Sequence, residues 1–129
     1  MKNFMELRQA ALPLLMEVPK PRRLDAALLD GVTNDAAAVC LCIEQRVRRL
    51  PEGEIAECLG LKRAHLSRVK SGSHNLTRAQ QIILQYLCSN TAIDQYAERI
   101  TAEIAEATET PADTIARLQS ELAQARRAA

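Results

Sequence analysis

Residues 52–71 read EGEIAECLGLKRAHLSRVKS, and this stretch decides the fold that we predict for the chain. Two short helices that cross through a turn of three or four residues need a small residue in the first helix and a turn residue that tolerates positive φ. Ala56 and Gly60 meet these needs at a spacing of four. The apolar residues expected to lock the pair together are Ile55, Leu59, Leu61, Leu66 and Val69. The stretch therefore predicts a helix over 54–59 packed against a helix over 63–70.

The outer face of the predicted helix 63–70 is basic and carries small side chains. Its residues and those beside it are Lys62, Arg63, Ala64, Ser67, Arg68, Lys70 and Ser71. No acidic residue lies between Lys62 and Arg78. Such a face suits the DNA major groove, because Arg pairs with guanine, Ser with several base edges and Ala with the thymine methyl group.

Residues 55–61 (IAECLGL) and 65–72 (HLSRVKSG) resemble the helix-turn-helix of Cro/C1-type (XRE-like) phage repressors, and the resemblance covers about residues 36–97. It implies a five-helix, lambda-repressor-like domain, with helices over 35–50, 54–59, 63–70, 77–88 and from about Thr91. It also implies two groups of DNA-binding residues. The base readers would be Arg63, Ala64, Ser67 and Arg68, and the phosphate contacts Lys62, Lys70, Ser71 and Arg78.

The composition of the 129 residues also predicts an all-α protein. Hydrophobic residues make up 47% of the chain but aromatic residues only 2%, with four glycines, whereas β-proteins depend on aromatic and β-branched residues. The charge is divided unevenly along the chain. Residues 1–78 hold 13 basic and 9 acidic residues, and residues 79–129 hold 4 and 7. A basic first part suggests contact with a polyanion, and a different role for the acidic end.

Residues 1–34 are expected to form a helical extension and linker before the DNA-binding domain at 35–90. Asn3 and Glu6 have the spacing of a capping pair, and Pro13 is expected to kink or end the first helix at about Leu12. Residues 18–23 (VPKPRR) predict an extended basic segment. It is either a solvated linker, which we favour, or an arm that lies along a DNA groove. A short helix is expected over 24–30.

Residues 91–129 are expected to form C-terminal helices that mediate self-association. One apolar stripe runs from Ile93 to Ile104 and another from Ile115 to Ala125, both at helical spacing. Because these stripes must pack on something, we predict a helical hairpin over 91–128 that joins two copies. The alternative is a single domain covered by its own tail. Tyr86 and Tyr96 are expected in the core.

Several classes of function are not expected for this sequence. It has no run of about 20 apolar residues and no signal peptide at its start, which predicts a cytoplasmic protein with reduced thiols. The cysteines lack zinc-ligand spacing, and no nucleophile, glycine loop or acidic metal cluster appears. We therefore expect no enzyme activity, no cofactor and no metal. His65 is expected to pack, and His74 has no assigned role.

Together these patterns predict a sequence-specific transcriptional regulator. Its partner would be an operator in double-stranded DNA, and a homodimer formed through 91–128 would favour an inverted repeat. The leading hypothesis is a repressor. Two alternatives remain open: an antitoxin or protein-binding adaptor that uses 1–34 to bind a protein partner, and a phage-type activator. Docking to DNA is the same for repressor and activator, so the sequence does not distinguish them.

Overall fold

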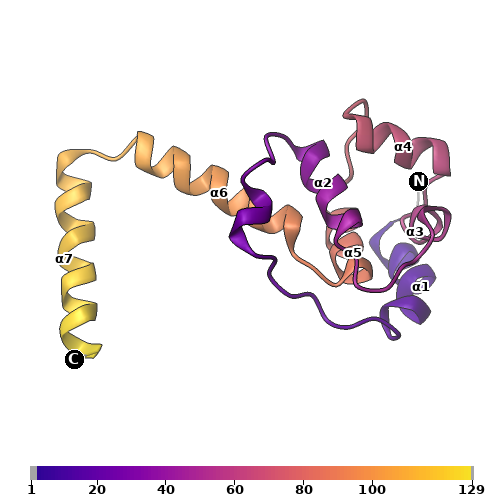
Figure 1. Ribbon diagram of the computed structural model, residues 1–129, viewed down its shortest axis with the longest axis horizontal. Coiled ribbons are helices and arrows are strands. Elements are labelled where there is room, and N and C mark those ends of the chain that lie inside the picture. The colour runs from indigo at the N-terminus through magenta and orange to yellow at the C-terminus, as the bar shows by residue number, and fades with distance from the viewer. Residues whose placement is uncertain (1–2, 129) are drawn as a thin grey trace. The chain divides into compact units, whose positions relative to one another are not determined.

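The computed structural model describes residues 3–128, and this part of the chain is all-α, as predicted. Within the described residues there is no β-strand, and the only β-type pairing is an isolated bridge between Arg22 and Asn90. The elements, labelled in Figure 1, are α1 (Phe4–Leu15), the 3-10 helix η1 (Ala26–Leu29), α2 (Asp35–Glu44), α3 (Glu52–Cys58), α4 (Arg63–Ser71), α5 (Arg78–Cys88), α6 (Ala92–Ala107) and α7 (Pro111–Ala128). Within residues 3–128, none of the helices is both long and apolar enough to span a membrane. The chain divides into two compact units, and the boundary along the sequence lies between Ala97 and Glu98.

The first unit is built around one hydrophobic core that all helices from α1 to α5 share. α2 packs on α4 and α5, α3 packs on α4 and α1, and α1 packs on α5. The largest fully buried apolar side chains are Leu29, Ile55, Leu59, Leu66, Leu84 and Leu87. Burial of each such side chain contributes about 1.5–3 kcal/mol, so this core is what holds the short helices α3 and α4 in place.

α1 does not end at Leu12. Of the two effects predicted for Pro13, a kink or an end of the helix, the end at Leu12 is wrong. The helix continues to Leu15 with Pro13 inside it, and the Met16 N–H still donates to the Leu12 carbonyl at 3.1 Å. Proline removes one helical hydrogen bond, but Leu14 and Leu15 pack against the core and hold the last turn. At its start, Asn3 accepts a hydrogen bond from the Glu6 N–H, so the predicted N-cap is confirmed.

α2 is shorter than predicted: it ends at Glu44 and does not reach Leu50. Two side chains, one from a distant part of the chain and one just after the helix, bind carbonyls at its end. Asn90 Nδ2 donates to the Cys42 carbonyl at 2.9 Å, and Arg46 Nη1 donates to the Ile43 carbonyl at 2.7 Å. Residues 45–50 leave the helix axis from there and lead to α3.

Residues 18–23, predicted to be extended, contain no helix, and the segment up to Leu24 docks on the turn between α5 and α6. The Arg22 N–H donates to the Ser89 carbonyl, and the Thr91 N–H donates to the Arg22 carbonyl, both at 3.2 Å. The Gln95 side chain then bonds both backbone groups of Leu24, at 2.8 and 2.9 Å. These contacts fix the segment in the first unit. After it, η1 covers only Ala26–Leu29 of the helix expected over 24–30.

The expectation for the two tyrosines is correct for one of them. Tyr96 is partly buried against the core, but Tyr86 is 48% exposed. The buried face of α5 carries Ile83, Leu84 and Leu87, and Tyr86 therefore lies on the opposite face. α5 begins with a capping box of Thr77 with Gln80, in which both reciprocal hydrogen bonds are present.

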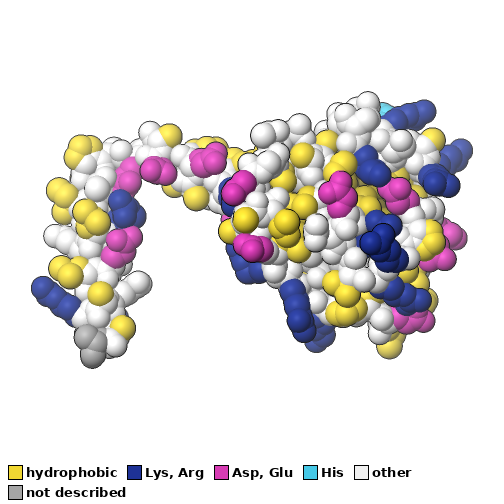
Figure 2. All heavy atoms as spheres, in the orientation of Figure 1, with side chains coloured by type: hydrophobic (Ala, Val, Ile, Leu, Met, Phe, Trp, Pro, Cys, Tyr) yellow, Lys and Arg dark blue, Asp and Glu magenta, His cyan; other side chains and the backbone are white. Residues whose placement is uncertain are grey.

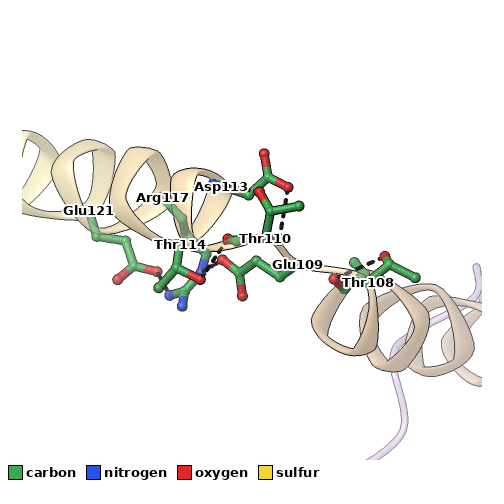
Figure 3. A network of polar contacts seen from close by, with 8 residues as sticks. Thr108, Glu109, Thr110, Asp113, Thr114, Arg117 and Glu121 are labelled. Atoms are coloured by element: carbon green, nitrogen blue, oxygen red, sulfur yellow. Dashed lines mark hydrogen bonds and ion pairs between the residues drawn. The ribbon is translucent and has the colours of Figure 1, made fainter.

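The second unit contains α7, which has no buried residue. Its start is set by a capping box, in which Thr110 N–H donates to Asp113 Oδ2 and Asp113 N–H donates to Thr110 Oγ1, both at 3.1 Å. Arg117 lies between Glu109 and Glu121 and bonds both, at 2.9 and 3.1 Å (Figure 3). Local contacts therefore specify this helix.

The expected hairpin does not form in the single chain. In a hairpin the stripes of α6 and α7 would cover each other, yet Ile104 is 58% exposed and Leu118 51% exposed. The capping box and the two ion pairs of Arg117 hold the start of α7 without such a contact. Self-association through these helices stays a prediction.

Candidate nucleic-acid interface

α3 and α4 are joined by a tight turn over residues 59–62. Gly60 has φ +72°, a left-handed conformation that favours glycine, and the Leu61 N–H donates back to the Ala56 carbonyl at 2.8 Å. Gln80 Nε2 of α5 donates to the Leu59 carbonyl at 3.0 Å and anchors the turn. The residues at the contact between the two helices are buried, namely Ile55, Ala56, Leu59, Leu66 and Val69. Leu61, in the turn, is partly buried against the core.

The face of α4 away from the core is open to solvent. Leu66 and Val69 point into the core, and the exposed residues are Lys62, Arg63, Ala64, Ser67, Arg68 and Ser71. All but one of the eight candidate DNA-binding residues are thus at the surface, the exception being the half-buried Lys70. Figure 2 shows Lys and Arg side chains over the part of the first unit where α4 lies. The buried turn and core hold this face in a fixed orientation.

Lys70 is held by an acidic partner that the sequence analysis missed. Its Nζ lies 2.5 Å from Oε1 of Glu52, at the start of α3. The hydrogen bond from Lys70 lowers the pKa of the Glu52 carboxyl below its ordinary value. Glu52 and Lys70 also line a shallow pocket of about 170 Å³ with Arg63 and Ser67. A carboxylate therefore lies within the basic face, and Lys70 must leave it to reach a phosphate.

No sequence signal pointed to Glu52. The residue lies 18 positions before Lys70, on another helix, and only the packing of α3 on α4 brings them together. The sequence from Lys62 to Arg78 contains no acidic residue, but the fold brings the Glu52 carboxylate next to Lys70.

The end of α4 is closed by its own loop. Gly72 caps the helix at φ +91°, and the Ser71 hydroxyl donates to the Arg68 carbonyl at 3.0 Å. The Ser73 N–H donates to the same carbonyl at 2.9 Å. The rings of His65 and His74 face each other with centroids 4.8 Å apart, so His65 is half-buried against the loop. The Ser71 side chain thus has a structural role at the candidate phosphate contact.

Arg78 lies at the start of α5, next to the N-cap Thr77. Its Nη1 lies 2.7 Å from Oδ1 of Asp94 on α6, while the side chain stays 59% exposed. Burial alone would raise the pKa of the Asp94 carboxyl, but hydrogen bonds from Arg78 and Gln85 lower it below its ordinary value. Arg78 is therefore oriented by an ion pair, with part of its guanidinium still open to solvent.

The basic segment Lys20, Arg22 and Arg23 lies apart from α4. Its backbone is held by Ser89 and Thr91, at the end of α5 opposite to Arg78. The backbone of the predicted linker is therefore docked on the first unit, and contact of its side chains with a DNA groove stays a prediction. The side chains of all three residues are exposed.

The four cysteines are thiols with no disulfide. Three are buried, and the partly buried Cys40 donates its Sγ–H to the Lys70 carbonyl at 3.4 Å. Burial raises the pKa of the Cys40 thiol. In the part of the chain that the structure describes, no three His, Cys, Asp or Glu side chains come together as metal ligands.

A hollow of about 670 Å³ lies in the second unit between the end of α6 and the start of α7. Its wall carries Glu109, Asp113 and Arg117, which bond each other and the backbone of this junction. Ligand sites are mostly apolar with a few convergent polar groups, and this open, charged wall does not match that pattern.

Comparisons of the chain with models of known families, with curated proteins and with solved structures found no match. The functional proposal therefore depends on the geometry of this chain alone.

Proposed function

We propose that the protein is a sequence-specific DNA-binding regulator with a helix-turn-helix formed by α3 and α4. The observation that carries the proposal is the exposed basic face of α4, mounted on a buried turn. A helix used only for packing has no need of Arg63 and Arg68 on its outer face together with Lys62 before it. A rigid cationic helix of this kind fits the major groove of duplex DNA.

In this proposal the contacts fall into two classes. Arg63, Ala64, Ser67 and Arg68 face base edges and supply discrimination, with Arg68 able to donate two hydrogen bonds to guanine. Lys62, Lys70, Ser71 and Arg78 face phosphates and supply affinity through counterion release. Lys70 exchanges Glu52 for a phosphate oxygen, and the carboxylate left behind disfavours a second phosphate at that position. Binding is thus steered to one register.

The regulator acts as a cytoplasmic homodimer on an inverted repeat. Two copies related by a two-fold axis present their α4 helices to half-sites about one helical turn apart. Occupancy of a promoter by such a dimer blocks transcription, which makes repression the simplest mode of action.

Selection of bound sites from random duplexes tests this function. We expect an enriched inverted repeat, and an affinity that falls steeply with salt in proportion to the number of phosphate contacts. Selection at two salt concentrations separates the two classes of contact, since base discrimination persists when the phosphate contribution is weakened. A chain that binds no duplex of any sequence at low ionic strength contradicts the proposal.

A second candidate function, a protein-binding adaptor of the antitoxin type, is favoured by one observation on α1. Its outer face exposes Met5 and Met16 at 55% and 80%, with Phe4 and Leu12 beside them at 51% and 42%. Exposed apolar side chains grouped on one helix are typical of a protein-binding surface. Met is common where a surface adapts to its partner.

Co-expression with the product of the neighbouring gene tests the adaptor function. If α1 binds that protein, the two co-purify, and Met5→Lys with Met16→Lys separates them while DNA binding is unchanged. Glu6→Lys, a charge change at an exposed position of α1 outside this apolar face, serves as the control. Co-purification that survives the two methionine changes contradicts a role for this face.

A further inference from the structure

The apolar face of α7 has no partner within the single chain. Ile115, Leu118 and Leu122 are 57%, 51% and 52% exposed, and Figure 2 shows hydrophobic side chains along this helix. They recur at spacings of three and four and lie on one side of the helix, where Ala125 continues the stripe. A stripe of this kind on a helix without any buried residue indicates a surface for association.

α7 is already formed before a partner binds. The capping box of Thr110 and Asp113, Pro111 at the first helical position, and Arg126 and Arg127 in the last turn all favour a helix locally. The stripe is therefore presented in an ordered form, and association need not spend free energy on folding the helix.

The stripe follows the heptad pattern of a two-stranded coiled coil. Ile115 and Leu122 take the first core position, a, and Leu118 and Ala125 take the second, d. In the first heptad, Ile115 at a with Leu118 at d is the combination that favours a parallel dimer, while the second heptad has Leu122 at a and Ala125 at d. The pattern thus fits a second copy of the same helix.

The charges beside the stripe select the same orientation. Glu121 lies on one flank of the stripe and Arg126 on the other, five positions later. In a parallel pair in register, these two flanks of the two helices face each other. An antiparallel pair would instead bring the two Glu121 carboxylates together. The ion pair of Arg117 with Glu121 also orients that carboxylate along the helix surface.

We propose that α7 pairs with α7 of a second copy as a parallel two-stranded coiled coil, in which Glu121 of each copy faces Arg126 of the partner subunit. The inference rests on the dimer of the proposed function and gives it a location, an orientation and a register. The α7 surface is self-complementary, because Glu121 on one flank of the stripe meets Arg126 on the other flank of an identical helix. The parallel arrangement has a two-fold axis along the helices, which is the symmetry that an inverted repeat requires.

Sedimentation equilibrium of the full chain at tens of micromolar tests the pairing. The wild type is expected to be a dimer, Leu118→Glu a monomer, and Ser120→Glu, on the opposite side of α7, a dimer. Arg126→Glu is expected to raise the dimer dissociation constant about fivefold, because two ion pairs become two repulsive contacts. Arg127→Glu makes the same charge change one residue away from the flank and is expected to leave the constant unchanged.

Disulfide trapping tests the orientation. Under mild oxidation Ala125→Cys is expected to form a 125–125 disulfide, identified by mass spectrometry, since identical core positions are adjacent only in a parallel pair. Ser120→Cys, on the outer side, is the matched control and is expected to give no such product. A Ser120→Cys product as abundant as that of Ala125→Cys, or none from Ala125→Cys in a dimeric sample, overturns the parallel pairing.

A monomeric wild type, a Leu118→Glu variant that stays dimeric, or equal effects of Arg126→Glu and Arg127→Glu also overturn the inference. These failures are distinct from failure of the proposed function. Leu118→Glu leaves α4 intact and retains low-salt binding to duplex DNA if the function is right. A dimeric wild type that binds no duplex contradicts the function and leaves the coiled coil in place.

Discussion

The two units of this chain form helices for different reasons. In the first unit, α3 and α4 have only seven and nine residues and no side-chain hydrogen bond at their N-caps, and they persist because Ile55 and Leu66 are buried in a shared core. In the second unit, α7 has 18 residues and no buried side chain, and its capping box and ion pairs act within a few residues. Short helices depend on tertiary packing, whereas a longer one can be specified locally.

This contrast matters for function, because the two units need different properties. A base-reading face must be held in one orientation, and the core beneath α4 does so. A self-association helix must keep its apolar stripe accessible, and local stabilisation of α7 leaves Leu118 exposed for a partner. Changes that remove one kind of support should therefore affect only one unit.

Leu84→Ala should have the largest effect. Leu84 is fully buried in α5, and its truncation is expected to lower the free energy of unfolding of the first unit by about 2–5 kcal/mol. Leu118→Ala removes the same atoms from an exposed site and should change that free energy by less than about 0.5 kcal/mol. Urea unfolding followed by circular dichroism measures both, and equal effects would remove the distinction between the units.

Arg68→Ala should leave the fold intact and weaken binding to the selected operator by about 1–3 kcal/mol, with relaxed preference at one base pair. Titrations with operator and random duplexes measure the loss. Arg8→Ala, on α1, is the control with an exposed arginine elsewhere in the first unit. Equal losses on operator and random DNA would mean that Arg68 contacts phosphate instead of a base.

Thr110→Ala should destabilise the start of α7 by about 0.5–2 kcal/mol, because it removes the side chain that accepts from the Asp113 N–H. Amide hydrogen exchange is expected to speed up in the first turn of α7 and stay unchanged in the first unit. Thr77→Ala, which removes the equivalent cap of α5, should instead be partly compensated by the core. A T110A variant with unchanged exchange would show that local capping does not control this helix.

Glu52 should give the smallest effect, a pH dependence of stability. Its pKa is lowered in the folded state by Lys70, so its contribution is present above the ordinary value of 4.5 and is lost as the pH falls through the lower, folded value. Because both side chains are about one-third exposed, the contribution is at most about 1 kcal/mol. Glu52→Gln should flatten this part of the stability profile, as urea unfolding at acidic and neutral pH would measure. An unchanged profile would show that the ion pair is screened by solvent.

The sequence predicted features whose causes lie within a few residues of each other. Helical spacing of apolar residues, the Asn3 cap of α1 and Gly60 in the turn all act over one or two helical turns, so a local pattern was enough to find them. The buried faces of α3 and α4 followed from the same periodicity, and so did the residues left on the outer face of α4.

The tertiary structure decided the features that join distant parts of the chain. Pro13 stays inside α1 because Leu14 and Leu15 reach the core, and α2 ends early because Asn90, 48 residues further on, binds its carbonyl. Lys70 meets Glu52 only across two packed helices. In each case a contact with a part of the chain distant in sequence decides the outcome, because tertiary packing and hydrogen bonds routinely override local propensity.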